Sequence, residues 1–257
     1  MNVPKPRLGV FKFSSCDGCQ LAILDCEEEL LPLTEQVAIG EFLEASADVK
    51  GGPFDLALVE GSVSTPGEVE RVKRVREESK TLVAIGACAT AGGLQALRNW
   101  DSLGLFQTAV YPHPEYLRCL EKASPISDYV PVDIELRGCP ISKSQLMQLF
   151  SSVLSGALPR LPGNAVCFEC KRRGNSCVVV AGGVPCLGPV TMDGCGAICP
   201  SFGRGCYGCF GPSNDVNLES YASWLVSHGT PRPAVRGLVR GINSNSKEFR
   251  EWLEKDD

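Results

Sequence analysis

The chain has 257 residues, of which 44% are hydrophobic, 7% aromatic and 21% charged, which is typical of a globular protein and not of a disordered or fibrous one. The net charge of -5 gives no electrostatic footprint for nucleic acid or for an acidic membrane surface. No run of eighteen apolar residues is present, and Met1–Val10 lacks the apolar core of a secretion signal. We therefore expect a cytoplasmic protein that contacts no membrane.

In the first part of the chain, short β-rich runs bounded by turn residues predict strands, and amphipathic runs between them predict helices. The predicted strands are Leu8–Phe13, Val37–Phe42, Phe54–Val59, Thr81–Ile85 and Tyr129–Leu136. The predicted helices are Cys19–Leu31, Pro66–Ser79, Ala91–Trp100 and Ser142–Ser155. This alternation indicates an α/β fold with a doubly wound parallel sheet, and the number of strands favours a flavodoxin-like domain over residues 1–160.

The second part differs in composition, with a boundary near Pro159–Pro162. Of the 52 residues in 161–212, 16 are Gly or Pro, and only Cys177–Ala181 resembles a strand. Such a segment has too few large apolar side chains for an ordinary core, so inorganic crosslinks must supply much of its order. We expect a small, irregular cysteine-rich domain here, followed by a tail over residues 213–257 with helices at Val216–Ser227 and Lys247–Lys255.

Fourteen cysteines are a heavy usage, and in a reducing compartment metal ligation is their expected role. In the first domain, Cys16 and Cys19 follow the first predicted strand, Glu60 ends the third, Cys88 follows the fourth and Cys139 follows the fifth. Ligands of open α/β sheets bind outside the carboxyl ends of the strands, so these four thiols are expected to converge on one site. The alternative is that Cys88 and Cys139 are ordinary buried thiols.

Glycines accompany these four cysteines and let the backbone approach a bulky centre. They are Gly18, Gly86, Gly92, Gly93 and Gly138.

Eight cysteines lie in the second domain and divide into two sets of four. They are Cys167, Cys170, Cys177, Cys186, Cys195, Cys199, Cys206 and Cys209. C-x2-C pairs at both ends suit tetrahedral zinc as well as iron, so a zinc-stabilised interaction module without a redox role is one interpretation. The Cys-Pro steps at Cys139-Pro140 and Cys199-Pro200, together with many glycine N–H groups, favour iron–sulfur clusters.

An ordered series of motifs spans residues 15–212. It consists of Ser15-Cys16-Asp17-Gly18-Cys19-Gln20, Val59-Glu60-Gly61, Gly86-Ala87-Cys88-Ala89-Thr90-Ala91-Gly92-Gly93, Gly138-Cys139-Pro140, Pro185-Cys186-Leu187-Gly188-Pro189-Val190-Thr191, Gly194-Cys195-Gly196 and Cys206-Tyr207-Gly208-Cys209. Taken together, the series resembles the small, electron-transferring subunit of [NiFe] hydrogenases.

The resemblance implies three [4Fe-4S] clusters that conduct electrons between a nickel–iron centre, held by a separate large subunit, and an acceptor. It implies no catalytic residue on this chain. The implied proximal ligands are Cys16, Cys19, Cys88 and Cys139; the distal ligands are Cys167, Cys170, Cys177 and Cys186; and the medial ligands are Cys195, Cys199, Cys206 and Cys209. Cys26 and Cys119 are left over as core thiols.

Two departures from the periplasmic members of that family are informative. Cys167 stands where those enzymes typically use histidine, and Cys199 offers a fourth medial thiolate, which indicates [4Fe-4S]. Thiolate-only ligation favours low potential, which suits a flavin- and NAD(P)-binding partner and a ferredoxin-like iron–sulfur subunit. Relatives that serve a deazaflavin or heterodisulfide reductase remain open. A relative of the cluster-bearing chain of respiratory complex I should lack the eight-cysteine domain.

Other polar residues have less specific interpretations. Glu60 could relay protons or accept hydrogen bonds from loop N–H groups, and we slightly favour the latter. His113 and His228 neighbour no ligand set and receive no role. Lys171-Arg172-Arg173 is either a solvated face or a docking site for an acidic partner.

Overall fold

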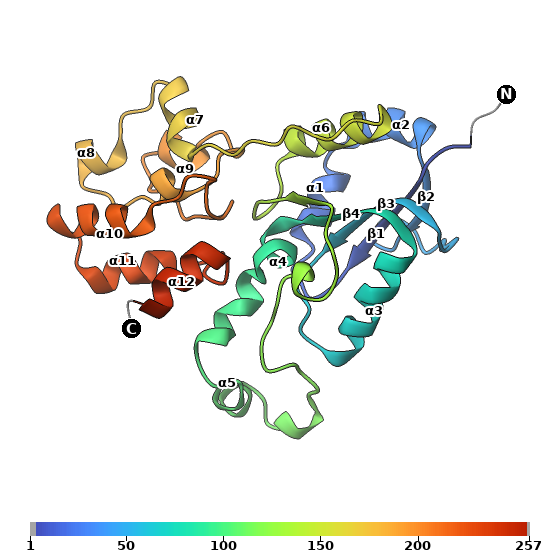
Figure 1. Cartoon of the computed structure of the whole chain (residues 1–257), viewed down its shortest axis with the longest axis horizontal. Coiled ribbons are helices and arrows are strands. Elements are labelled where there is room, and N and C mark those ends of the chain that lie inside the picture. The colour runs from blue at the N-terminus through green and yellow to red at the C-terminus, as the bar shows by residue number, and fades with distance from the viewer. Residues whose placement is uncertain (1–3, 256–257) are drawn as a thin grey trace. The chain divides into compact units, whose positions relative to one another are not determined.

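The computed structural model of the chain describes residues 4–255 and divides the chain into two compact units (Figure 1). The division falls between Leu158 and Pro159. The first unit is built on a sheet and the second on short helices and loops.

The first unit contains five parallel strands in the order β2-β1-β3-β4-β5. Their bounds are β1 (Arg7–Lys12), β2 (Ala38–Phe42), β3 (Phe54–Glu60), β4 (Ser79–Ile85) and β5 (Ile134–Leu136). The predicted flavodoxin-like parallel sheet is confirmed. The last strand is shorter than the predicted Tyr129–Leu136 because Pro131, which has no N–H group to donate, precedes it.

Helices cover both faces of this sheet, with α3 on one face and α1, α2 and α6 on the other (Figure 1). The α-helices are α1 (Gly18–Leu24), α2 (Glu27–Gln36), α3 (Pro66–Glu77), α4 (Gly86–Ala91), α5 (Leu103–Val110) and α6 (Lys143–Leu154). The 3-10 helices are η1 (Gly93–Trp100), η2 (Pro114–Tyr116) and η3 (Ile126–Asp128). Both faces are covered, and accordingly β3 and β4 contain the uninterrupted hydrophobic runs Leu56–Val59 and Leu82–Ile85.

Two predicted helices differ in detail. The predicted Cys19–Leu31 helix is broken between α1 and α2, where the fully buried Cys26 donates its thiol to the carbonyl of Ala22 at 3.3 Å. The predicted Ala91–Trp100 helix is 3-10 over most of its length. The reason is Gly92, whose left-handed conformation (φ 83°) ends α4.

The second unit consists of short helices around the cysteines, followed by three longer ones. Its elements are α7 (Val166–Arg172), α8 (Val178–Gly182), η4 (Gly188–Val190), α9 (Ile198–Ser201), α10 (Leu218–Ser227), α11 (Arg232–Val239) and α12 (Lys247–Lys255). The strand predicted at Cys177–Ala181 is wrong: this valine-rich run forms α8, which has no neighbouring strand and ends at left-handed Gly183.

Helices predicted at Val216–Ser227 and Lys247–Lys255 are present as α10 and α12, with α11 between them. The three helices pack against one another, and α10 also packs on η4 of the cysteine-rich segment. Each helix contributes buried apolar side chains, among them Leu225, Val235, Phe249 and Leu253. In the part of the chain that the structure describes, no helix has the length and apolarity needed to cross a membrane.

A capping box fixes the start of α3 beside the loop that leads to Cys16. The Thr65 hydroxyl accepts from the Glu68 N–H at 3.3 Å, and the Glu68 carboxylate accepts from the N–H groups of Thr65 (2.9 Å) and Ser64 (2.8 Å). The other Glu68 oxygen accepts from the Ser14 hydroxyl at 2.9 Å. One carboxylate therefore joins α3 to the chain leaving β1.

We expect Thr65→Ala to lower the free energy of unfolding by about 1 kcal/mol, because an N-cap side chain is lost. Chemical denaturation followed by circular dichroism measures this loss. Thr34→Ala, whose exposed hydroxyl only donates to the Leu31 carbonyl, is the control and should stay within about 0.5 kcal/mol of the parent. Equal effects of the two changes would contradict the importance of the cap.

Candidate metal centres

Four strands of the first unit end at the same level. Across the sheet Lys12 pairs with Glu60, Glu60 with Ile85, and Ile85 with Leu136. The segments that follow these residues therefore leave the sheet at one edge. Three of them carry the cysteines that the sequence places at strand ends.

The structure brings those four cysteines together. Cys19 lies in α1 and Cys88 in α4, while Cys16 and Cys139 lie in the loops after β1 and β5. Cys19 interacts electrostatically with Cys88 and Cys139, and Cys88 and Cys139 interact with Cys16. Burial raises the pKa of Cys88 to about 12 and raises the pKa values of Cys19 and Cys139. A metal centre bound here must therefore displace thiol protons.

Glycine backbone lies directly against two of these thiols. A Cβ atom on Gly86 would collide with the Cys19 sulfur, and a Cβ on Gly93 would lie 2.5 Å from the Cys88 sulfur. Both glycines also have left-handed backbone, with φ of 82° and 59°. Four thiols with backbone this close fit the ligand number and the bulk of an iron–sulfur cubane.

Glu60 fixes the first turn of α1. Its side chain is buried, with one oxygen accepting from the Cys19 N–H at 3.1 Å and the other from the Gln20 side-chain amide at 2.8 Å. Burial raises the pKa of Glu60, while the hydrogen bonds from Gln20 and Cys19 oppose the rise. These contacts support the structural interpretation of Glu60. Gln20 was not singled out from the sequence, although its position next to Cys19 in the motif was the available signal.

A salt bridge holds the loop between the two N-terminal cysteines. The Lys12 ammonium lies 2.6 Å from the Asp17 carboxylate, and Asp17 has the left-handed conformation (φ 66°) that lets the chain turn into α1. Thus both ends of this loop are attached to the strands below it.

In the second unit, a set of four cysteines lies in or next to α7, α8 and η4. Cys167 and Cys170 lie in α7, Cys177 caps α8 and Cys186 precedes η4. Cys167 interacts electrostatically with the other three, and burial raises its pKa to about 11. The Cys186 sulfur accepts hydrogen bonds from the N–H groups of Gly188 (3.4 Å) and Cys206 (3.1 Å).

The remaining four cysteines are not separated cleanly from the first set. Cys195 interacts with Cys199 at α9, while Cys206 interacts both with Cys186 and with Cys209. Cys206 belongs to the buried cluster against which Cys195 packs, so the two share one small core. Burial raises the pKa of Cys206 to about 12.

Two contacts around these sets have no local sequence signal. The Tyr221 hydroxyl in α10 donates to the Cys186 carbonyl at 2.5 Å, across 35 positions of the chain. The Arg173 guanidinium lies so close to Gly196 that a Cβ there would be 2.6 Å from it. Arg173 therefore supports the loop of Cys195.

The other residues considered from the sequence lie apart from these sets or on the surface. Cys26 is buried at the break between α1 and α2, and Cys119 is partly buried. His113 is exposed 3.0 Å from the Glu115 carboxylate, and exposed His228 stacks on Trp224 at 4.1 Å. Among residues 4–255, the cysteine sets included, no three His, Cys, Asp or Glu side chains are close enough together to hold a single metal ion.

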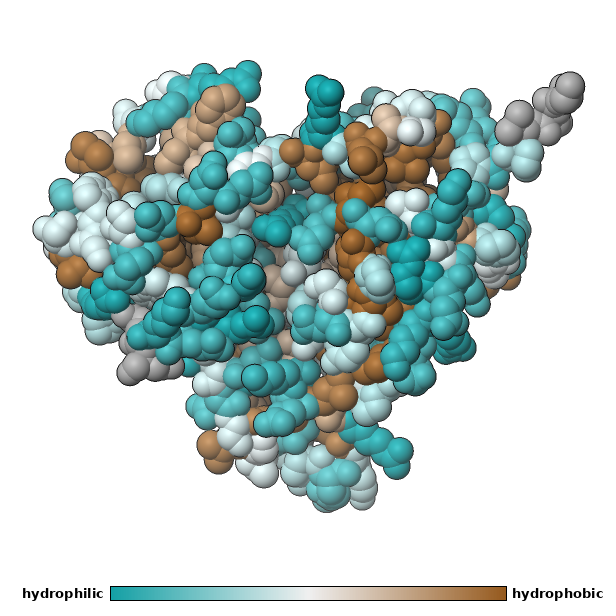
Figure 2. Space-filling model, in the orientation of Figure 1, coloured by the Kyte–Doolittle hydropathy of each residue, from teal (hydrophilic) through white to brown (hydrophobic). Residues whose placement is uncertain are grey.

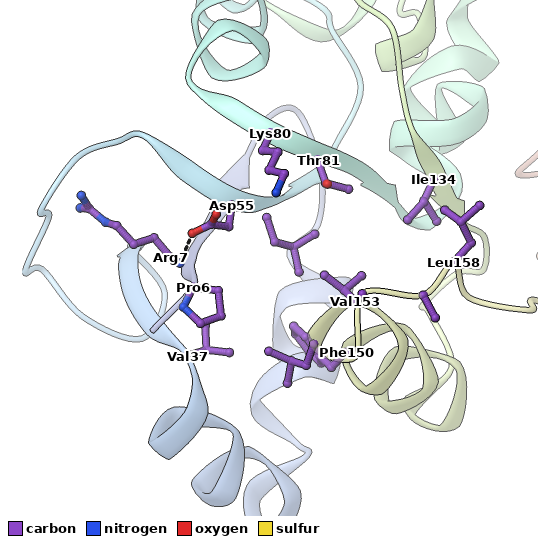
Figure 3. Close-up of a pocket in the computed structure, with 14 residues that line it drawn as sticks. Pro6, Arg7, Val37, Asp55, Lys80, Thr81, Ile134, Phe150, Val153 and Leu158 are labelled. Carbon is purple, nitrogen blue, oxygen red and sulfur yellow. Dashed lines mark hydrogen bonds between the residues drawn. The ribbon is translucent and has the colours of Figure 1, made fainter. Parts of the chain in front are cut away.

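A cavity of about 400 Å³ lies at the opposite edge of the sheet, where the strands begin (Figure 3). Val37, Ile134 and Phe150 contribute apolar lining, and at its edge the Arg7 N–H donates to Asp55 at 2.9 Å. It contains no cysteine and is separate from the cysteine site of this unit.

Comparison with known proteins defines the class. The family model for the NADH ubiquinone oxidoreductase, 20 Kd subunit, matches residues 16–153, and the chain belongs to this family. The match lies within the first unit.

Relatives that extend further are hydrogenase subunits. Sulfhydrogenase 2 subunit delta of Pyrococcus furiosus is 40% identical over 82% of this chain and 89% of its own length. A subunit of the F420-non-reducing hydrogenase vhu of Methanocaldococcus jannaschii is 30% identical over 83% and 84% of the two chains. A solved NAD+-reducing [NiFe]-hydrogenase in the H2-reduced state is 31% identical, with a TM-score of 0.57, over 62% of this chain and 96% of that chain. Within its family, this chain is a homologue of hydrogenase small subunits.

Gly86→Ala should prevent the four thiols of the first unit from closing around a cluster, because the added methyl group collides with the Cys19 sulfur. We expect anaerobically purified Gly86→Ala to bind less iron than the parent protein, by about the four atoms of one cubane. Gly67→Ala is the matched control, since nothing lies within 4 Å of a Cβ at Gly67. Full iron content in Gly86→Ala would contradict the packing argument.

Proposed function

We propose that this chain is the electron-transfer subunit of a cytoplasmic [NiFe] hydrogenase complex and that it relays electrons through three [4Fe-4S] clusters. The observation that carries the proposal is the convergence of Cys16, Cys19, Cys88 and Cys139 at one sheet edge with glycine backbone against the thiols. Membership of the family and the hydrogenase relatives support the same role.

The proposed proximal set is Cys16, Cys19, Cys88 and Cys139; the distal set is Cys167, Cys170, Cys177 and Cys186; and the medial set is Cys195, Cys199, Cys206 and Cys209. When bound, [4Fe-4S] clusters supply one-electron exchange at potentials that depend on charge, hydrogen bonding and exposure. The residues of this chain hold the clusters and tune their surroundings. The N–H groups of Gly188 and Cys206 donate to the Cys186 sulfur, and such hydrogen bonds would tune a cluster held there.

The proposed partner at the proximal site is the hydrogenase large subunit. The site lies on loops at one edge of the sheet, and Cys16 is exposed in the isolated chain. An exposed cluster exchanges electrons with oxygen, so we expect the rim around Asp17 and Thr90 to be buried by the partner; Glu60, which was expected on this rim, is already buried within the chain. The interface should belong to the large, obligate class, above roughly 2,000 Å² in total.

The proposed acceptor is a flavin- and NAD(P)-binding subunit reached through a ferredoxin-like iron–sulfur subunit. The 31% identity to a solved NAD+-reducing hydrogenase supports this choice, but that match covers only 62% of the chain. The F420-non-reducing relative covers 83%, which favours an acceptor of another kind as a second candidate. H2-dependent reduction of NAD+ and NADP+ by the purified complex tests the proposed NAD(P)-linked acceptor. This proposal fails if neither nucleotide is reduced.

The metal content of anaerobically purified protein tests the cluster assignment. We expect about twelve iron atoms per chain, from three cubane sites, and no nickel. Two equivalents of zinc with only traces of iron would instead identify a zinc-stabilised interaction module.

Cys206→Ser tests the medial position. We expect hydrogen-dependent acceptor reduction by the complex to fall by at least about tenfold because the relay is interrupted, while isotope exchange at the nickel site of the partner continues. Cys119→Ser should leave both activities unchanged, because Cys119 belongs to none of the proposed sets. Unchanged acceptor reduction in Cys206→Ser would remove this residue from the relay.

A further inference from the structure

A groove of about 400 Å³ lies between α8 and α9 in the second unit. Val178, Ala181 and Val184 line one side, and Pro200, Ser201 and Gly203 line the other. The groove therefore lies entirely within one compact unit and does not depend on how the two units are arranged.

The two walls of the groove are fixed to each other. The Asn175 side-chain amide donates to the Ser201 hydroxyl at 2.9 Å, and that hydroxyl donates to the Ala197 carbonyl at 2.9 Å. The same Asn175 amide lies 3.8 Å from the Cys170 sulfur. The groove is thus held open by hydrogen bonds and is attached directly to a proposed distal ligand.

Large apolar side chains around the groove are exposed. Val180 and Phe202 are 79% and 80% exposed, and Phe168 and Ile198 are 52% and 54% exposed. In α8 no residue is buried. Figure 2 shows hydrophobic residues at the surface over α7 and α8. A run of exposed apolar side chains on one small unit indicates a protein-binding surface.

The segment that carries the groove, residues 165–205, is basic. Between residues 165 and 205 the basic residues Lys171, Arg172, Arg173 and Arg204 are all exposed. The only acidic residues in this span are Asp193, which is buried, and Glu169, which accepts the Ala197 N–H. This segment is therefore basic in a chain whose net charge is -5, so an acidic surface is its electrostatic complement.

The groove lies next to cysteines of two proposed sets. Cys177 occupies the N-cap position of α8, and Cys199 lies in α9. Each wall of the groove therefore carries a cysteine from a different proposed set. A protein bound here would lie beside both the distal and the medial sites.

We propose that the α8–α9 groove and its basic rim form the docking site for an acidic, ferredoxin-like iron–sulfur protein, which inserts an apolar side chain between Val178 and Pro200. The inference rests on the proposed electron-transfer function and assigns its exit surface. Apolar contact provides affinity, and the rim, with Arg172 stacked 5.6 Å above the Phe168 ring, orients the acidic partner.

The test uses the complex of this chain with the large subunit alone, so that the groove is free, and a plant-type acidic [2Fe-2S] ferredoxin as the probe. We expect Val180→Asp, which places a negative charge on α8 beside the groove, and Ala181→Trp, which fills the groove, each to raise the Kd for ferredoxin by about tenfold or more. H2-dependent reduction of methyl viologen, a small dye that needs no docking surface, and iron per chain should stay unchanged. The matched control is Val226→Asp on α10, where the valine is 38% exposed and lies outside the groove.

Three results would overturn the proposal. The first is an equal Kd for Val180→Asp and Val226→Asp, and the second is ferredoxin binding that does not weaken with added salt. The third is loss of self-association, or release of the large subunit, on Val180→Asp, because a different partner would then cover the groove. If the chain bound no iron at all, the proposed function itself would fail; normal iron and viologen reduction with unaltered ferredoxin binding would reject the docking site alone.

Discussion

The common level at which the parallel strands end is the constraint on which the first unit depends. The register that pairs Lys12 with Glu60 and Glu60 with Ile85 brings the loops carrying the cysteines to one edge. Glu60 then fixes α1 by accepting the Cys19 N–H at 3.1 Å. Pairing of the strands in a buried sheet sets the positions of the backbone that carries these cysteines. Only the cysteine side chains need to adjust when a metal centre binds.

In the second unit, the cysteines are positioned without a sheet. Its small core contains Cys170, Cys186 and Cys206 themselves, packed with Val166 and Ala197. The main chain pairs locally around them, as in the hydrogen bond from the Leu187 N–H to the Cys206 carbonyl at 3.0 Å. Helices α10–α12 pack against one another, and α10 also contacts η4. The proposed ligands are therefore structural residues of this unit, and loss of its clusters should cost more order here than in the first unit.

Much of this arrangement could be predicted from the sequence, because it depends on local patterns. The strands were recognisable as hydrophobic runs, and the cysteines of the first unit followed them directly. The helical form of the run beginning at Val178 could not be predicted from its β-branched residues, because a strand needs a pairing neighbour and this segment has none. The contacts of Tyr221 with Cys186 and of Arg173 with Gly196 depend on chain folding between distant residues and leave no local pattern.

The central claim is that all twelve proposed cysteines hold cubane clusters. Mössbauer spectroscopy of 57Fe-enriched, anaerobically reduced protein tests this claim most directly, because it distinguishes iron in cubanes from iron in other centres. The account predicts that essentially all iron appears as [4Fe-4S] with thiolate ligation, in three populations of about equal area. A substantial fraction of [3Fe-4S] or mononuclear iron, or a total of only one cluster, would contradict it.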